Sequence, residues 1–308
     1  MSGGSVGADV VAVICGPTAA GKSEIALRLA ARHGRPILVA DSRQVYRRFD
    51  IGTAKPTAEA RHRVPHFGLD VADPTERFSA AQWAEHAEHT LAKAATGLSP
   101  IVVGGTGMYL RALFEGLFVE PVVDEERRKK LLNWLDTRPT EELRQWAVEL
   151  DPVRATLGRT QLLRAVGVAL LTGERISRLH ETHARQPGWS PRYLVVDPGP
   201  VLHDRIMSRL DAMLGAGWLD EVRSLDGLPD DAPAWKATGY RRLRDVVRGI
   251  TSLNEARENI LIETRQYAKR QRTWFRHQLA EEHTTRVNPG QPDAEAIIGA
   301  WWESVRTV

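Results

Sequence analysis

One segment near the start of the chain limits the possible folds more than any other. Residues 16–23 read Gly-Pro-Thr-Ala-Ala-Gly-Lys-Ser and fit the G-x-x-x-x-G-K-[ST] pattern of a phosphate-binding loop. The apolar run 10–15 before it is typical of a buried strand, and residues 23–30 after it have helical spacing. In such a loop backbone N–H groups surround phosphate oxygens, the lysine adds positive charge and the serine can hold Mg²⁺. We expect a ligand with at least a diphosphate, bound by Gly16, Pro17, Thr18, Ala19, Ala20, Gly21, Lys22 and Ser23.

Two further apolar runs predict strands of the same sheet. Residues 36–40 and 100–107, the latter ending in a glycine turn, alternate with helical segments, which predicts a parallel α/β sheet flanked by helices. Ligands of such sheets gather at the carboxyl ends of the strands, so Asp41 is expected to face the phosphate loop. An aspartate there serves as a Mg²⁺ ligand or as a general base, and the pattern leaves both roles open. The Thr106 hydroxyl either reaches the same edge or belongs to a simple tight turn.

The middle of the chain has no segment that resembles a strand until residues 192–197. The apolar spacing before them predicts short helices with charged outer faces. After them, a long helix is expected over 204–224, on which Arg205 and Arg209 share a face. The expected organisation is a P-loop NTPase-like core of residues 10–124 and 188–308, a smaller all-helical lobe inserted at 125–187, and a flexible tail at 1–9.

Positive charge collects in the C-terminal part of the chain. The net charge is only +3, yet ten Lys and Arg stand against four Asp and Glu between Arg241 and Arg276. A long basic helix is expected over 253–280, with Tyr267 and Trp274 among its cations. Cations that contact phosphates and aromatic rings that stack on bases are typical of RNA-binding surfaces. This segment therefore predicts a nucleic-acid partner.

Several classes of protein are excluded by composition. The single cysteine, Cys15, allows no intrachain disulfide and no cysteine-based zinc module. No apolar run approaches the roughly 18 residues that span a bilayer, and residues 1–9 lack the features of a signal peptide. We expect a cytoplasmic monomer without a membrane partner.

Six motifs follow one another along nearly the whole chain. They are Gly-Pro-Thr-Ala-Ala-Gly-Lys-Ser at 16–23, Asp-Ser-Arg-Gln-Val-Tyr at 41–46, Asp-Ile-Gly-Thr-Ala-Lys-Pro at 50–56, Val-Gly-Gly-Thr-Gly-Met-Tyr at 103–109, Gly-Tyr-Arg at 239–241 and Thr-Arg-Gln-Tyr-Ala-Lys-Arg-Gln-x-Thr-Trp-Phe-Arg at 264–276. Together they resemble the bacterial tRNA dimethylallyltransferases, also called tRNA isopentenyltransferases. The resemblance implies transfer of a dimethylallyl group from dimethylallyl diphosphate to N6 of adenosine 37, immediately 3′ of the tRNA anticodon, with release of diphosphate.

The resemblance also implies roles for individual residues. Asp41 would be the general base on the adenine amine, Thr106 would lie near the bridging oxygen of the donor, and Arg209 would offset charge on the diphosphate. Arg205 would join the phosphate loop, with Mg²⁺ held at Ser23. The implied contacts with the anticodon stem-loop are Asp41, Ser42, Arg43, Gln44, Thr106, Arg128, Lys236, Gly239, Tyr240, Arg241, Lys269, Arg270, Gln271, Arg272, Trp274 and Arg276.

The chain departs from the family pattern in the helical lobe. Leu157-Gly158-Arg159-Thr160-Gln161 stands where the family usually has Asn-Asp-x-x-Arg, and Gly167 stands where it has the Glu of Arg-Ala-Leu-Glu. Three alternatives are weighed: an adenylate dimethylallyltransferase acting on free AMP, ADP or ATP, a small-molecule kinase using ATP, and an RNA-binding protein without activity. The lobe and the basic helix argue against a free nucleotide as acceptor. The retention of Lys22 and Asp41 argues against lost catalysis.

Overall fold

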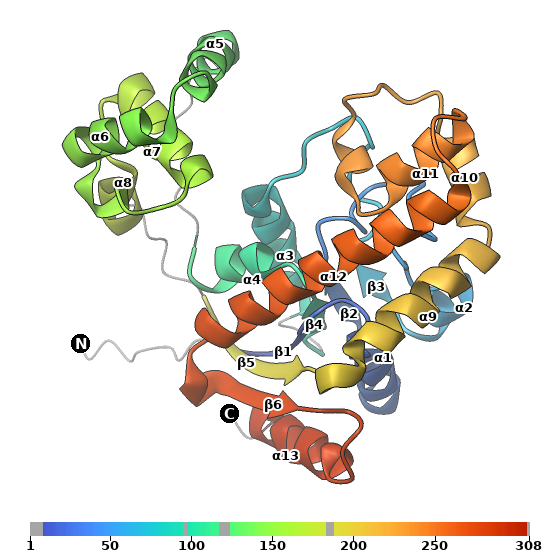
Figure 1. The fold of residues 1–308 in the computed structure, drawn as a ribbon. Coiled ribbons are helices and arrows are strands. Elements are labelled where there is room, and N and C mark those ends of the chain that lie inside the picture. Colours follow the sequence, from blue (N-terminus) through green and yellow to red (C-terminus); the bar gives the residue numbers. More distant parts are fainter. Residues whose placement is uncertain (1–8, 95–97, 117–123, 183–187, 307–308) are drawn as a thin grey trace, which may run out of the picture. The chain divides into compact units, whose positions relative to one another are not determined.

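The computed structural model describes residues 9–94, 98–116, 124–182 and 188–306. The chain divides into two compact units, one of Met1–Phe114 with Gly188–Val308 and one of Glu115–Pro187 (Figure 1). The tail expected at 1–9 lies outside the described residues except for Asp9, which begins the first strand.

The larger unit is built on a six-stranded sheet in which every strand pair is parallel, as predicted. The strand order is β3-β2-β4-β1-β5-β6 (Figure 1). The bounds are β1 (Asp9–Cys15), β2 (Ile37–Ala40), β3 (His66–Phe67), β4 (Ile101–Gly104), β5 (Trp189–Val196) and β6 (Thr284–Val287). The sequence did not predict β3 and β6, because β3 has two residues and β6, at an edge, reads Thr-Thr-Arg-Val.

Both faces of this sheet are buried, which explains why β2, β4 and β1 after Asp9 are continuously apolar. Side chains alternate along β1, so Ile14 enters one apolar cluster and Cys15 the other. The Ile14 face is covered by α1 (Lys22–His33) and α13 (Ala294–Arg306). The Cys15 face is covered by α3 (Ala80–Ala94) and α4 (Gly107–Phe114). Burial raises the pKa of the Cys15 thiol to about 12, as befits a small core residue.

Five more α-helices lie in the described part of the larger unit. They are α2 (Ala58–Arg63), α9 (Leu202–Gly215), α10 (Trp218–Ser224), α11 (Tyr240–Val247) and α12 (Leu253–His277). The single helix predicted over 204–224 is wrong, because Gly217 has a φ of 94° and starts α10 as a separate helix. The long basic helix is confirmed as α12, which packs against α9 through Ala268, Leu202 and Ile206.

The smaller unit contains the helices α5 (Glu125–Asp136), α6 (Thr140–Leu150), α7 (Arg159–Thr172) and α8 (Ile176–Thr182). Its own core joins Leu135, Leu143, Leu162 and Val166, each fully buried. Among the described residues of the whole chain, no helix is both long and apolar enough to cross a membrane.

Candidate active site

The phosphate loop connects β1 to α1 and has the backbone geometry that its glycines require. Gly16 has a φ of 141°, and a Cβ atom there would lie 2.2 Å from the Val196 carbonyl oxygen. Lys22 folds back so that its Nζ donates a 2.5 Å hydrogen bond to the Pro17 carbonyl oxygen. Burial and the neighbouring Arg209 charge lower the pKa of Lys22 to about 8, although the Asp41 carboxylate opposes this. The ammonium group therefore titrates near physiological pH.

Asp41 follows β2 directly and is held by the turn that it begins. Its Oδ1 accepts hydrogen bonds from the backbone N–H groups of Arg43 at 2.8 Å and Gln44 at 3.4 Å. The Thr106 Oγ1, after β4, accepts a 3.0 Å bond from the Ser42 N–H. The carboxyl ends of two neighbouring strands therefore bring Asp41 and Thr106 to the same edge of the sheet.

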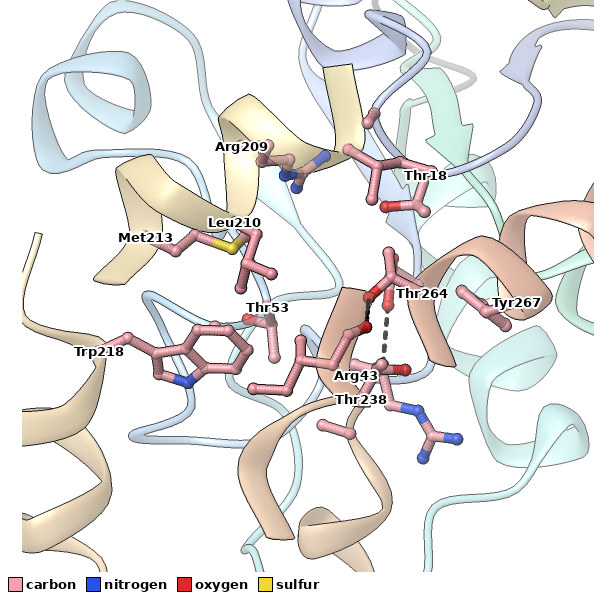
Figure 2. A pocket seen from close by; sticks show the side chains of 16 residues that line it. Thr18, Arg43, Thr53, Arg209, Leu210, Met213, Trp218, Thr238, Thr264 and Tyr267 are labelled. Atoms are coloured by element: carbon pink, nitrogen blue, oxygen red, sulfur yellow. Dashed lines mark hydrogen bonds between the residues drawn. The ribbon is translucent and has the colours of Figure 1, made fainter. Parts of the chain in front are cut away.

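Two cavities meet beside the phosphate loop. The smaller has a volume of about 90 Å³ (Figure 2). The larger, of about 360 Å³, includes Lys22 and Ser23 in its wall. The residues common to both are Thr18, Asp41, Thr53, Arg209 and Tyr267. The Asp41 carboxylate therefore borders both cavities, and a ligand bound at the phosphate loop can reach it.

The two predicted arginines of α9 lie at this meeting point. Arg205 donates a 3.1 Å hydrogen bond from Nη1 to the Ala20 carbonyl oxygen of the phosphate loop. Arg209 lines both cavities, where burial lowers its pKa and the Asp41 carboxylate acts in the opposite direction. Four residues of separation place both side chains on the face that meets the loop.

Tyr267 belongs to the site, although no catalytic role was predicted for it from the sequence. Burial raises the pKa of its phenol to about 12, and the Asp41 carboxylate acts in the same direction. Thr264 lies on the same face of α12, three residues earlier, and lines the smaller cavity with it (Figure 2). The sequence signal that could have identified Thr264 and Tyr267 is their spacing of three residues within the motif 264–276, which places them on one face of a helix.

Thr53 is a second such residue, and its loop is fixed by the buried ammonium group of Lys55. That group donates to the Tyr46 carbonyl oxygen at 2.5 Å and to the carboxylates of Asp50 at 2.7 Å and Asp70 at 2.5 Å. The bonds of Lys55 fix the shape of the segment 50–56, and this segment places Thr53 in the walls of both cavities. Gln44, predicted to contact tRNA, donates from Nε2 to the Thr53 carbonyl oxygen at 2.9 Å.

The predicted tRNA contacts on α12 fall into two groups. Gln271 is buried: its Oε1 accepts from the Thr18 N–H and its Nε2 donates to the Gly105 carbonyl oxygen, each at 2.8 Å. Arg272 donates to the Asp197 carboxylate at 2.5 Å, and the half-buried ring of Trp274 lies where a side chain at Gly107 would be. Exposed side chains make up the second group, Lys269, Arg270 and Arg276.

The predicted contacts around α11 are divided in the same way. Lys236 and Arg241 are exposed, whereas Gly239 and Tyr240 are buried. The Tyr240 hydroxyl donates a 2.6 Å hydrogen bond to Glu221 Oε1 in the protein interior. The structure thus gives Gln271 and Tyr240 internal partners, and their direct contact with tRNA stays a prediction.

Arg128, the remaining predicted contact, belongs to the smaller unit. It lies on α5 and lines a cavity of about 430 Å³ between α5 and α7. Arg164 and Gly167 of α7 line the same cavity, so one of the residues that depart from the family pattern, Gly167, borders this space.

The residues beside the phosphate loop fit a magnesium ion bound together with a diphosphate. In the described part of the chain, no three His, Cys, Asp or Glu side chains are grouped closely enough to hold a metal ion alone. Mg²⁺ is commonly held by one or two protein oxygens and by substrate phosphates. The exposed Ser23 hydroxyl at the start of α1 supplies an oxygen of this kind.

Comparisons with known proteins agree over most of the chain. The family model described as IPP transferase matches residues 44–278, and the one described as isopentenyl transferase matches residues 9–66. The tRNA dimethylallyltransferase of Acaryochloris marina is 41% identical over 276 residues, covering 86% of this chain and 88% of that protein.

Solved structures give the same result. The crystal structure of a full-length tRNA isopentenylpyrophosphate transferase from Bacillus halodurans has a TM-score of 0.67 and 31% identity, covering 97% of this chain and 98% of its own. A eukaryotic dimethylallyltransferase that acts on tRNA has a TM-score of 0.74 and 25% identity, and the match covers 95% of this chain and 77% of that one.

Proposed function

Because this chain belongs to the family of tRNA dimethylallyltransferases, it is a transferase that prenylates tRNA, and we propose that the reaction occurs where its two cavities meet. The observation that carries this proposal is the convergence of the phosphate loop, Asp41 and Arg209 on one space. The donor is dimethylallyl diphosphate, and the acceptor is N6 of adenosine 37 in the anticodon loop. Since tRNA is the substrate, the expected place of action is the cytoplasm.

The donor diphosphate lies in the phosphate loop, where Lys22 and Arg209 offset its charge. Its binding favours the protonated form of Lys22, whose lowered pKa reflects burial beside another cation. Arg205 braces the loop through Ala20 and adds a further positive charge. A Mg²⁺ ion held by Ser23 and diphosphate oxygens would further stabilise the leaving group.

Asp41 takes a proton from the exocyclic amine as N6 attacks C1 of the donor. The N6–C1 bond forms while the C1–O bond breaks, and the electron pair of that bond leaves with the diphosphate. Backbone N–H groups at Oδ1 orient the carboxylate, and the Thr106 hydroxyl lies beside the same turn. An amine conjugated with an adenine ring is a weak nucleophile, so a base and a stabilised leaving group both accelerate the reaction.

The adenine must leave the stacked anticodon loop to reach Asp41. Exposed cations are placed to contact the RNA backbone during that step: Lys269, Arg270 and Arg276 on α12, Arg241 on α11, and Lys236 just before α11. Arg128 is proposed to add a contact from the smaller unit. A free nucleotide would need none of these groups.

The experiment that tests this function offers the purified protein labelled dimethylallyl diphosphate and Mg²⁺ with unmodified tRNA or with AMP. Label on N6 of adenosine 37, located by nuclease digestion and mass spectrometry, is the expected result. Label on AMP would instead assign a free-nucleotide acceptor. Label on neither would remove the proposed donor and acceptor together.

A further inference from the structure

The smaller cavity has one apolar end. Ile206, Leu210 and Met213 line it from α9, and Trp218 and Ile260 complete this part of the wall. In Figure 2, Met213 and Trp218 lie on one side of the cavity, and Thr18 and Tyr267 lie on the other. Apolar side chains of this kind favour a hydrocarbon group over the polar edge of a base. This end of the cavity is therefore suited to the tail of the donor.

The reaction geometry brings the tail to the edge of this space. With the diphosphate in the phosphate loop and C1 beside Asp41, the donor carbon lies where the two cavities meet. N6, C1 and the leaving oxygen lie in one line, so the hydrocarbon tail must leave that line at an angle. The smaller cavity opens from this point between α9 and α12.

The volume of the smaller cavity favours a short hydrocarbon chain. An apolar cavity of about 150 Å³ holds the six carbons of benzene. A space of about 90 Å³ is smaller than that, so it favours the short dimethylallyl chain over the ten carbons of a geranyl group.

Trp218 forms a wall that cannot move back. A Cβ atom at Gly52 would lie 2.0 Å from its Nε1, and a Cβ atom at Gly239 would lie 2.4 Å from its Cη2, so the backbone contacts the ring at two places. The Tyr240 ring meets it edge-on at a centroid distance of 5.4 Å. The indole is only 2% exposed and cannot adjust to a longer donor.

Met213 is the adjustable part of the same wall. It is half-buried in the last turn of α9, and its unbranched side chain adapts to irregular space. Its length determines how far the cavity extends beside the fixed indole ring.

We propose that Met213 and Trp218 together limit the donor to a five-carbon chain, with Trp218 as the fixed wall and Met213 as the side chain that closes the cavity. This inference rests on the proposed function. It predicts that residues of the larger unit determine which donor length is accepted.

The test compares geranyl diphosphate with dimethylallyl diphosphate as donors for unmodified tRNA, using wild type, Met213→Ala and the control Met207→Ala. Met207 lies on the same helix but is 38% exposed. The quantity measured is the ratio of kcat/KM for the two donors. Met213→Ala should shift this ratio towards geranyl diphosphate by roughly tenfold to 100-fold, as expected when apolar space is opened, whereas Met207→Ala should leave it unchanged.

An unchanged ratio in a Met213→Ala protein that still transfers dimethylallyl would overturn the inference. Met213→Phe provides a second test if the alanine variant does not fold: it should raise the KM for dimethylallyl diphosphate and leave the KM for tRNA unchanged. A rise in the tRNA KM alone would assign the cavity to the adenine instead. Failure of the wild type to transfer dimethylallyl would remove the proposed function itself, which is a different result from an unchanged ratio.

Discussion

The Gln271 side-chain oxygen accepts a 2.8 Å hydrogen bond from the Thr18 N–H, across 253 positions of the chain. The other end of the same amide donates to the Gly105 carbonyl oxygen. One side chain of α12 thereby connects the phosphate loop to the turn after β4, and the geometry of the donor site depends on it.

Gln271→Ala should therefore weaken both stability and donor binding. The substitution leaves the buried Gly105 carbonyl group without a partner, which costs about 1–3 kcal/mol, and it also frees the half-buried Thr18 N–H. Denaturant unfolding and the KM for dimethylallyl diphosphate measure the two effects. Gln266→Ala, at an exposed position of the same helix, is the matched control. Equal KM values for the two variants would show that the loop keeps its shape without this bond.

Asp41→Asn should lower kcat by roughly 10² to 10⁴ and leave tRNA affinity within a few-fold of wild type. The amide oxygen can still accept from the Arg43 and Gln44 N–H groups, so the turn is retained while the base is lost. Single-turnover transfer and filter binding measure the two quantities. Asp220→Asn, on an exposed face of α10, controls for charge. Wild-type turnover by the Asn variant would remove Asp41 as the base.

Donor binding should depend on pH through Lys22. Its pKa in the folded protein is about 8, so the free protein loses this positive charge above that pH and the Kd for dimethylallyl diphosphate should rise. Calorimetric titration from pH 7 to 10 should show the rise in wild type and a flatter profile in Lys22→Met. Parallel profiles for the two proteins would assign the titration to another group.

The same titration predicts how stability changes with pH. Between about pH 8 and the ordinary lysine pKa of 10.5, the unfolded chain binds a proton that folded Lys22 has released. Lys22 should therefore destabilise the folded protein less as pH rises through this range, so that the free energy of unfolding increases. Denaturant unfolding of wild type minus that of Lys22→Met isolates this contribution. A difference that falls with pH would contradict the lowered pKa.

Replacing Lys269 and Arg270 with alanine should reduce the dependence of tRNA binding on salt. Each phosphate contact that is lost lowers the slope of log K against log salt concentration by about 0.7 to 0.9. Arg257→Ala is the control, because Arg257 is on α12 but pairs with Asp211 at 2.7 Å. If the double variant and the control have the same slope, these two cations do not contact RNA.

Gly52→Ala should destabilise the protein by about 1–3 kcal/mol, because the added methyl group would overlap the Trp218 ring. Thermal unfolding measures the loss. Gly227→Ala is the control, since a Cβ atom there would have no neighbour within 4 Å. Equal melting temperatures for the two variants would show that the indole ring can move, and would weaken its role as a fixed wall.

Local sequence patterns predicted the parts of this protein whose structure is determined by residues adjacent in the sequence. The phosphate loop, the inner strands and Asp41 at a strand end each follow from a few consecutive side chains. The strand β6 and helix α13 were missed, since one is short and polar and the other follows it near the end of the chain. The break before α10 was missed because a single glycine, such as Gly217, is tolerated within many helices.

Contacts between distant segments could not be read from the sequence. Nothing local shows that Gln271 reaches Thr18, or that Tyr240 is buried against Glu221 while Arg241 next to it is exposed. Thr53 and Tyr267 enter the site from separate motifs, and only the folded chain places them in the same two cavities.

Because Gln271 is bonded to both Thr18 and Gly105, it fixes the position of α12 along its own axis. Each residue of a helix advances it by about 1.5 Å and turns it by about 100°. With Gln271 anchored, one residue inserted between Tyr267 and Gln271 would turn Tyr267 away from Asp41 and move every preceding position along the axis. The position of Tyr267 in the site therefore does not depend on the exposed side chains of the helix, whereas the number of residues between 264 and 271 must stay constant.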